Sequence, residues 1–175
     1  MTRPGIRPSR RAKVVSATLL GAVVIALAVL VSLLAVHNNR ASALDHARKD
    51  ALTQATKRVP EVLSYSYKTF DKDNARARQD TTGQFAKDFA TLSDTVIAPG
   101  AKKAETVTKA QAIASSVLTA SRTQVDVMLF IQQSTTSKTQ TTTKIDKSTV
   151  RVTMAKANGA WLVSNLATIP ETPLK

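Results

Sequence analysis

The sequence predicts an α+β domain preceded by one hydrophobic N-terminal segment, and three observations support this prediction. An uncharged run of 23 residues occupies positions 14–36. Apolar residues then recur at helical spacing until about residue 98, and β-branched residues dominate after Glu105. Asn158-Gly159, the preferred pair of a tight hairpin, separates two strand-like runs near the C-terminus. Helices before a meander of strands indicate helices packed on one face of a curved antiparallel sheet of about four strands.

The uncharged run at 14–36 has the length and apolarity of a transmembrane helix, which needs about 20 apolar residues. The preceding segment, 1–13, is basic and contains no acidic residue; its cations are Arg3, Arg7, Arg10, Arg11 and Lys13. Positive charge beside a span stays in the cytoplasm. We therefore expect a single-pass protein of the cytoplasmic membrane, with a cytoplasmic N-terminus and residues from 37 onward outside.

A cleaved signal peptide is the alternative, because Ala41-Ser42-Ala43 has the small-x-small form of a cleavage site. The apolar core of such a peptide is typically about 7–15 residues long, shorter than the run at 14–36. An uncleaved signal-anchor is therefore favoured.

The exported part is expected to contain a helical stalk at 37–63, a domain at 64–169 and a frayed tail at 170–175. The stalk carries a modest apolar stripe at helical spacing, formed by Leu44, Ala47, Ala51, Ala55 and Val59. A second helix after Thr82 carries a stripe predicted to be buried in the core, formed by Phe85, Phe89, Leu92 and Val96. Pro99-Gly100 is expected to end that helix.

Two strands are predicted at 107–119 and 124–133. In the second strand, one face carries Val125, Val127, Leu129 and Ile131, and the other carries Met128 and Phe130, so burial on both faces is expected. The stretch 132–144 is rich in Ser and Thr and is expected to form an exposed, mobile loop.

The hairpin around Asn158-Gly159 has a predicted register, because a two-residue turn makes partner numbers add up to 317. The pairs expected on one mostly apolar face are Val150 with Ala167, Val152 with Asn165, Met154 with Val163, and Lys156 with Trp161. On this interpretation Trp161 lies in the core, with the Lys156 stem across its indole.

Composition excludes several kinds of site. The chain has no cysteine, so it has no disulfide, thiol nucleophile or thiolate metal site. Its formal charge is +13, but the cations are scattered and the domain is expected outside the cytoplasm. We therefore expect no nucleic-acid partner, and attribute the charge to a solvated surface facing anionic lipid or an acidic partner.

Catalytic groups are scarce in the predicted domain. The two histidines, His37 and His46, lie in the predicted stalk, so no Ser-His-Asp arrangement and no zinc site are expected. Asp126 is the best general acid–base candidate, with Tyr65 or Tyr67 as a hydrogen-bond donor. The favoured alternative is a structural Asp126, facing an edge or paired with Arg151. We therefore expect a protein that is not an enzyme and has no cofactor.

Several strings resemble the Mce-associated membrane proteins of actinobacteria. They are LSYSYKTFDKDNARA at 63–77, the helix start Gly83-Gln84-Phe85, and DKSTVRVTMAKANGAWLVSNL at 146–166. The resemblance implies an NTF2-like (cystatin-like) domain on a membrane stalk, a shape shared with VirB8-type secretion subunits. It also implies an accessory role in an Mce-type system that imports lipids such as sterols or fatty acids.

The functional hypothesis is a non-enzymatic scaffold that docks Mce-type transporter subunits at the outer face of the cytoplasmic membrane. One alternative is a VirB8-like subunit for assembly of a secretion system. Another is a lipid-binding module with a pocket between helices and sheet, whose candidate lining residues are Tyr65, Tyr67, Ile113, Val117, Asp126, Met128 and Phe130. A hydrolase or isomerase based on Asp126 is the third and least favoured.

Overall fold

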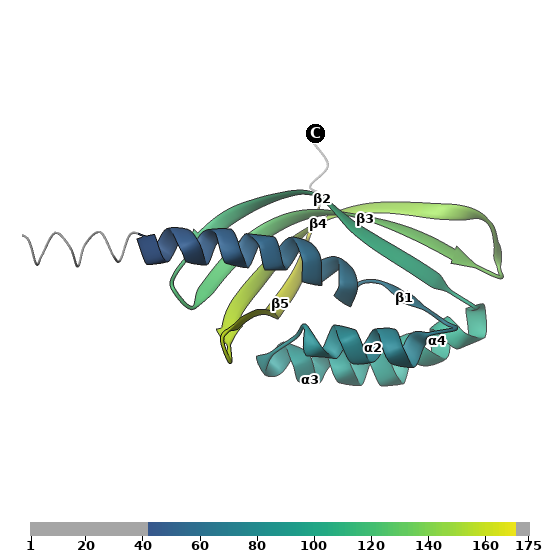
Figure 1. The fold of residues 1–175 in the computed structure, drawn as a ribbon. Helices are drawn as coiled ribbons and strands as arrows, with labels where there is room; N and C mark the ends of the chain where they lie inside the picture. The colour runs from purple at the N-terminus through teal and green to yellow at the C-terminus, as the bar shows by residue number, and fades with distance from the viewer. Residues whose placement is uncertain (1–41, 171–175) are drawn as a thin grey trace, which may run out of the picture. The chain divides into compact units, whose positions relative to one another are not determined.

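The computed structural model describes residues 42–170, in which helices lie against a curved five-stranded antiparallel sheet (Figure 1). A long helix occupies residues 42–62. The elements that follow are β1 (Tyr65–Ser66), α2 (Phe70–Gln79), α3 (Gly83–Leu92), η1 (Ser93–Ile97), α4 (Ala98–Ala104), β2 (Val107–Ala120), β3 (Gln124–Ser137), β4 (Gln140–Ala157) and β5 (Ala160–Ile169).

Some predictions lie outside the described residues: the basic tail at 1–13, the span at 14–36, Ala41 of the candidate cleavage site, and all but the first residue of the tail at 170–175. Within residues 42–170, no helix combines the length and apolarity needed to cross a membrane.

The long helix belongs to the domain over most of its length, which corrects the expected boundary at residue 64. The compact unit begins at Leu44. The stripe formed by Ala47, Ala51, Ala55 and Val59 is buried against the sheet and is part of the hydrophobic core. Small side chains let the helix approach the sheet closely, so the modest stripe expected on a stalk is an inner face of the domain.

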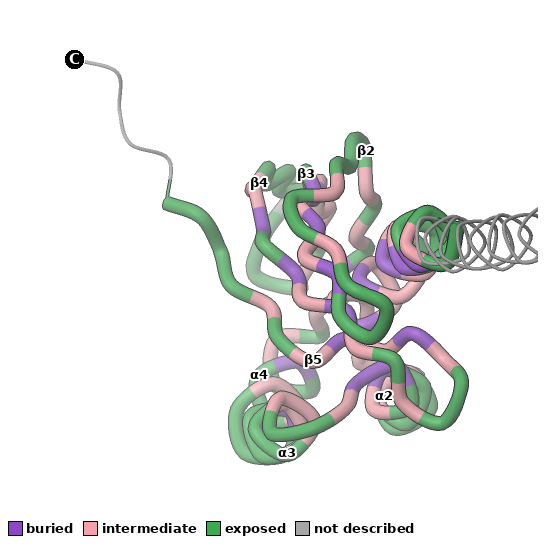
Figure 2. The backbone as a smooth tube through the Cα atoms, turned by 90° about the vertical axis from the view of Figure 1, so that its left-hand side faces the viewer, coloured by how far each residue is buried: buried purple, intermediate pink, exposed green. Residues whose placement is uncertain are grey.

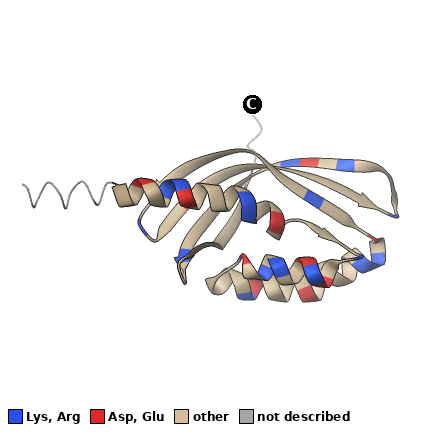
Figure 3. Ribbon diagram, in the orientation of Figure 1, with Lys and Arg blue, Asp and Glu red and all other residues tan. Residues whose placement is uncertain are grey.

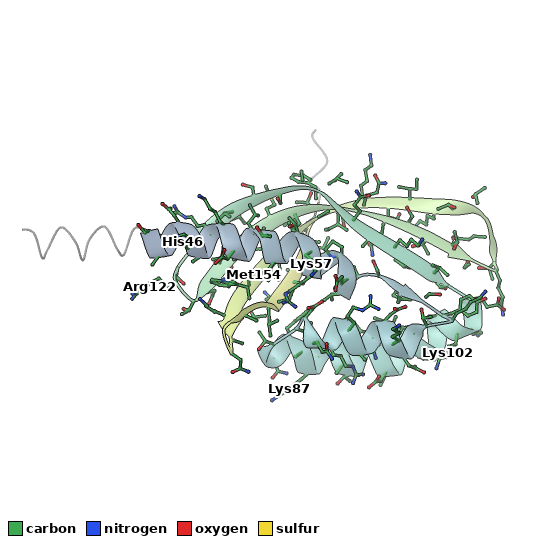
Figure 4. The ribbon with its side chains drawn as sticks, viewed as in Figure 1. His46, Lys57, Lys87, Lys102, Arg122 and Met154 are labelled. Carbon is green, nitrogen blue, oxygen red and sulfur yellow. The ribbon has the colours of Figure 1, made fainter. Side chains whose placement is uncertain are left out.

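The strands follow one another in the order β1-β2-β3-β4-β5, one strand more than expected because β1 adds a two-residue pair to β2. One face of the central strands carries fully buried side chains, among them Val127, Leu129 and Val152. Met154 lies between the sheet and the long helix (Figure 4). Figure 2 shows this buried inner face turned toward the long helix.

The hairpin of β4 and β5 confirms the predicted turn and half of the predicted register. Asn158 and Gly159 both have positive φ, 50° and 83°, as the tight turn requires. Met154 pairs with Val163 and Lys156 with Trp161, as expected. Beyond them Ser164 is an extra residue, and its hydroxyl donates to the Thr153 carbonyl at 3.0 Å.

This β-bulge moves the partners by one position, which corrects the pairs predicted farther from the turn. Val152 pairs with Leu166 and Val150 with Thr168, rather than with Asn165 and Ala167.

The polar stretch 132–144 is not the loop that was expected. It continues β3 and β4 into a long hairpin whose turn lies between the paired residues Ser137 and Gln140. Cross-strand pairing satisfies the hydrogen-bonding groups of the backbone even where the side chains are not hydrophobic. Threonine also has a high propensity for β-strands. The tip is fixed to the end of α4, because the Lys138 amide donates to the Ala104 carbonyl at 2.9 Å.

The helix after Thr82 continues past Pro99-Gly100, which was expected to end it. The π-helical turn η1 precedes Pro99, and α4 then runs on to Ala104. Proline lacks an amide hydrogen and crowds the preceding turn of an α-helix. A wider π-turn at this point accommodates both effects, so the helical path bends instead of stopping.

Candidate functional site

An apolar pocket of about 270 Å³ opens between the long helix, α2, the α3–η1 segment and β3. Its apolar lining comes from all three helical segments: Val62, Leu63, Phe70, Ala77, Phe89, Leu92 and Ile97. Its polar lining is smaller and consists of Ser64, Tyr65, Asp73, Asn74, Ser93 and Gln133. We call this cavity the helix pocket.

The aromatic wall of the helix pocket is set by the turn between β1 and α2. The rings of Tyr65 and Phe70 meet edge to face, with centroids 5.7 Å apart. Asp73 holds the turn, because its carboxylate accepts bonds from the Ser66 amide at 3.1 Å and the Thr69 hydroxyl at 2.7 Å. The Asp73 carboxylate therefore satisfies two donors of the turn that carries the Tyr65–Phe70 contact.

The opposite wall is formed by the π-helical turn. Ser93 is buried, and its hydroxyl donates to the Asn74 side-chain oxygen of α2 at 2.7 Å. This bond joins η1 to α2 across the floor of the pocket. π-Turns often occur at functional sites, and here the turn places Ser93 and Ile97 in the same wall.

Exposed apolar side chains lie at the mouth of the helix pocket. The predicted core stripe of α3 is only half-buried at Phe85 and Phe89, and it is exposed at Leu92 and Val96, by 49% and 58%. Phe85 packs against the core, and Phe89 and Leu92 line the helix pocket. Val96 directly precedes the lining residue Ile97, so the C-terminal part of the stripe is a surface feature rather than core. We call Leu92 and Val96 the exposed stripe.

A buried ion pair ties the long helix to the α2–α3 turn beside this region. The Arg58 side chain donates to Asp80, which is 5% exposed. The backbone carbonyl of Asp80 accepts the Val163 amide at 2.9 Å, so β5 is joined to the same turn. Burial raises the pKa of Asp80, and Arg58 opposes this effect only in part.

The predicted lining residues are divided among several surfaces. Tyr65 lines the helix pocket, whereas Tyr67 is half-buried in the β1–α2 turn, its amide bonded to the Thr106 carbonyl. Val117 packs against the core from the inner face of β2. Met128 and Phe130 lie on the outer face of β3, where Phe130 is 39% exposed, so the expected burial of both faces is corrected.

Two further candidates are also outside the helix pocket. Ile113 is exposed on β2. Asp126 lies on the outer face of β3, where it accepts hydrogen bonds from Thr119 at 3.2 Å and Thr153 at 2.9 Å. This bonding gives Asp126 a structural role between neighbouring strands, and no Asp126–Arg151 ion pair occurs in the described part of the chain.

Tyr65 is the one predicted lining residue that lies in the helix pocket, and the large apolar residues that were missed include Phe70, Phe89, Leu92 and Ile97. The sequence did contain a signal for these residues. The predicted apolar stripe extends beyond the ten residues of α3, which is farther than the contacts of that helix with the core require. What the periodicity does not reveal is which part of a stripe is covered by another element.

The pocket is suited to binding an apolar group. Described residues include no cluster of three or more His, Cys, Asp or Glu able to hold a metal ion. Ligand pockets usually measure about 300–1,000 Å³. At about 270 Å³, the helix pocket matches one bulky side chain or a short acyl segment better than a whole lipid.

The fold defined by these elements is the VirB8-like α+β fold. An IcmL-like type IV secretion system protein of Legionella pneumophila superposes with a TM-score of 0.61 at 12% identity, covering 73% of this chain and 96% of that one. The VirB8 protein of Agrobacterium tumefaciens gives 0.56 at 12% identity, covering 70% and 92%. The predicted fold class, helices on a curved antiparallel sheet, is confirmed by these likenesses.

Sequence comparison places the chain in a family with members in Mycobacterium tuberculosis. It is 33% identical over 124 residues to outer membrane protein Rv1973 of Mycobacterium tuberculosis, covering 70% of this chain and 76% of that protein. The chain therefore belongs to the same family as Rv1973. It is also 32% identical over 123 residues to the uncharacterized protein Rv1362c of that organism, but spans only 56% of its length. No protein-family model matches the chain.

Proposed function

We propose that this protein is a non-enzymatic assembly subunit of a cell-envelope complex, which binds another subunit through the helix pocket and the exposed stripe. The observation that carries the proposal is the exposure of Leu92 and Val96 beside an apolar cavity. Buried apolar anchors in well-packed pockets dominate the energy of protein interfaces. The occupant we propose is a large apolar side chain on a helix of the partner, with the exposed stripe flanking it.

The surroundings of the pocket support a protein partner. α2 and α3 carry charges of both signs (Figure 3), and an Arg78–Asp94 ion pair joins α2 to η1 near the exposed stripe. An apolar centre with a charged rim is the usual organisation of a protein interface. The VirB8-like fold supports the same proposal, since its structural neighbours include a subunit of a type IV secretion system.

Two classes of complex are candidates for the partner. The fold favours an assembly role like that of VirB8-type subunits, and the strings at 63–77 and 146–166 connect the chain with Mce-type lipid import. In both cases the run at 14–36 would anchor the protein in the cytoplasmic membrane and hold the domain outside it. The two proposals share the docking surface and differ in the subunit that occupies it.

Substitution at the exposed stripe separates docking from folding. Leu92→Asp changes an exposed residue, so the free energy of unfolding should change by no more than about 0.5 kcal/mol. The loss of this apolar contact beside the partner's anchor should weaken partner binding by about 2 kcal/mol, or roughly 30-fold. Affinity purification of the tagged full chain from its own cells, in mild detergent, measures the yield of each co-purifying subunit.

Ile145→Asp is the matched control, because Ile145 is also exposed, at 59%, but lies on the β3–β4 hairpin. The control should retain the subunit that Leu92→Asp loses. Mass spectrometry then assigns that subunit to a secretion-type or an Mce-type complex. Equal recovery with both variants would overturn the proposed docking surface, and a natural chain that purifies alone would overturn the assembly role.

A further inference from the structure

One edge of the sheet has unpaired backbone over most of β2. β1 pairs only with Val107 and Thr108, and the Ala110 amide is bonded to the Ser64 hydroxyl at 2.8 Å. From residue 111 to 120, β2 has β3 on one side and no strand partner on the other among the described residues. A free edge of this length is a template for pairing with another strand.

This edge lacks the charges that normally protect one. No charged residue occurs between Lys109 and Arg122, although the chain carries a net charge of +13. Natural edge strands are commonly blocked by lysine or another charge. Two copies of so basic a chain repel one another over most of their surface, so an uncharged edge is where their close approach costs least.

The opposite edge, on β5, is partly covered. The Thr82 amide donates to the Val163 carbonyl at 2.8 Å, and the Val163 amide donates to the Asp80 carbonyl at 2.9 Å. Pro170 directly follows the strand. The free part of β5 is therefore shorter than the free part of β2.

Two bulges give β2 a pattern that is nearly symmetric. Register shifts lie between Ala112 and Ala114 and between Val117 and Thr119, which leaves residues 114–117 as a regular segment. The extra residues at the bulges are Ile113 and Leu118, exposed by 52% and 39%. A β-bulge can itself twist an edge away from pairing, but here each bulge presents an apolar side chain instead of a charge, and the segment between the bulges is regular.

We propose that β2 pairs antiparallel with β2 of a second copy of this chain, around a two-fold axis at Ser116. Antiparallel partners must point to the same face of the sheet, so only residues of like orientation can lie opposite one another. Ala114 and Ser116 share the outer face, because their partners on β3 are Phe130 and Met128. Val117 packs against the core, so strand alternation places the next residue, Leu118, on the outer face as well. The proposed register therefore pairs Ser116 with itself and Leu118 with Ala114 of the second copy.

The second copy is favoured over another protein because the pattern complements itself. With the axis at Ser116, each Leu118 lies beside the Ile113 bulge of the other copy, and each Ala114 already neighbours the exposed Phe130. At each end of the short paired segment, two apolar side chains that are exposed in the single chain would thus be covered by the other copy. A two-fold interface uses the same patch on both subunits, and β2 supplies both halves of this one.

Single-cysteine variants of the full chain in mild detergent test the pairing, since the natural chain contains no cysteine. Opposed residues in antiparallel strands have Cα atoms about 4.5–5.5 Å apart, which a disulfide can bridge. Ser116→Cys should therefore form a disulfide-linked dimer under mild oxidation, at least about tenfold faster than a cysteine that meets its equivalent only by collision. Ala167→Cys, at an exposed position of the β5 edge, supplies that comparison.

A mixture of Ala114→Cys and Leu118→Cys chains tests the register. The mixture should cross-link faster than either variant alone, because the axis places these two residues opposite each other. Ser116→Lys should abolish the dimer in light scattering while leaving the circular dichroism spectrum unchanged, and Leu92→Asp should leave the dimer intact. Equal cross-linking of Ser116→Cys and Ala167→Cys, or a natural chain that is monomeric at high concentration, would overturn the proposal.

Discussion

Asp80 shows how one carboxyl group connects three parts of this domain. Its side chain is paired with Arg58 of the long helix, its backbone carbonyl holds Val163 of β5, and it sits at the turn between α2 and α3. One carboxylate oxygen, Oδ2, lacks a hydrogen-bond partner among the described residues. The desolvation of a buried carboxylate therefore outweighs its attraction to Arg58, and the pKa is raised.

This raised pKa predicts the sign of a pH dependence. Folded protein holds a proton on Asp80 at pH values where the unfolded chain, with a pKa of about 3.9, has lost it. Stability gained from Asp80 is thus fully present below about pH 4 and is lost as pH rises through the folded-state pKa. Relative to Asp80→Asn, the natural chain should lose free energy of unfolding between pH 4 and pH 7.

Urea unfolding of both proteins across this range measures the difference. The asparagine variant does not titrate at this position, so it removes the contribution of the other acidic groups from the comparison. If the natural chain instead became more stable relative to Asp80→Asn as the pH rises, the attraction between Asp80 and Arg58 would outweigh the desolvation of the carboxylate.

At the scale of single elements, two glycines with different backbone conformations provide a matched test. Gly159 has φ of +83°, whereas Gly100 lies within α4, and a Cβ added at either position would meet no atom within 4 Å. Gly159→Ala should cost about 1 kcal/mol, because L-residues disfavour this conformation. Gly100→Ala should instead stabilise the domain by up to about 1 kcal/mol.

Thermal and urea unfolding of the two variants measure these effects. Because an added Cβ would contact no other atom at either site, steric clashes do not contribute. The backbone conformation therefore determines the sign of the change in the free energy of unfolding. A stabilised Gly159→Ala variant would contradict the tight turn at Asn158-Gly159.

Elements with strong local signals could be predicted from the sequence. Asn158-Gly159 predicts a hairpin, because few other residue pairs readily adopt positive φ at both central positions of a two-residue turn. Ser164 carries no comparable signal, so the bulge and the shifted pairs beyond it could not be anticipated. Pro99 strongly indicates that a regular α-helix cannot continue unchanged. The helix must either end there or widen into a π-turn, and the surrounding contacts determine which of the two occurs.

The polar hairpin extension shows a second reason for failure. Low hydrophobicity predicts disorder when a segment has no partner, but residues 132–137 pair with the first part of β4 on one side and 132–136 pair with β2 on the other. Pairing and anchoring at Lys138 are long-range events, and composition does not report them.

The candidate site could be predicted only in part for a related reason. Tyr65 lines the helix pocket, but the strand residues proposed together with it, such as Met128 and Phe130, lie on the outer face of β3. Alternation identifies two faces of a strand without saying which one a helix covers. The buried stripe of the long helix, Ala47 to Val59, settles this in the folded domain by covering the face that carries Leu129.

For the whole molecule, two separate surfaces carry the proposals. The exposed stripe at Leu92 and Val96 flanks the helix pocket, whereas the free edge of β2 belongs to the sheet. In Figure 1, α3 lies below the sheet, and no residue of β2 lines the helix pocket. A dimer formed through β2 would therefore leave both helix pockets free for other subunits, which suits an assembly subunit.

Site-specific photo-cross-linking in living cells tests the docking surface most directly. A photoreactive phenylalanine analogue at Val96 should cross-link to one partner subunit, because Val96 is 58% exposed and directly precedes Ile97, which lines the helix pocket. The same analogue at Ile145, exposed by 59% on the hairpin, should not capture that subunit. A specific adduct from Val96 that disappears with Leu92→Asp is the predicted result. No adduct from Val96, or the same adduct from both positions, would contradict the account.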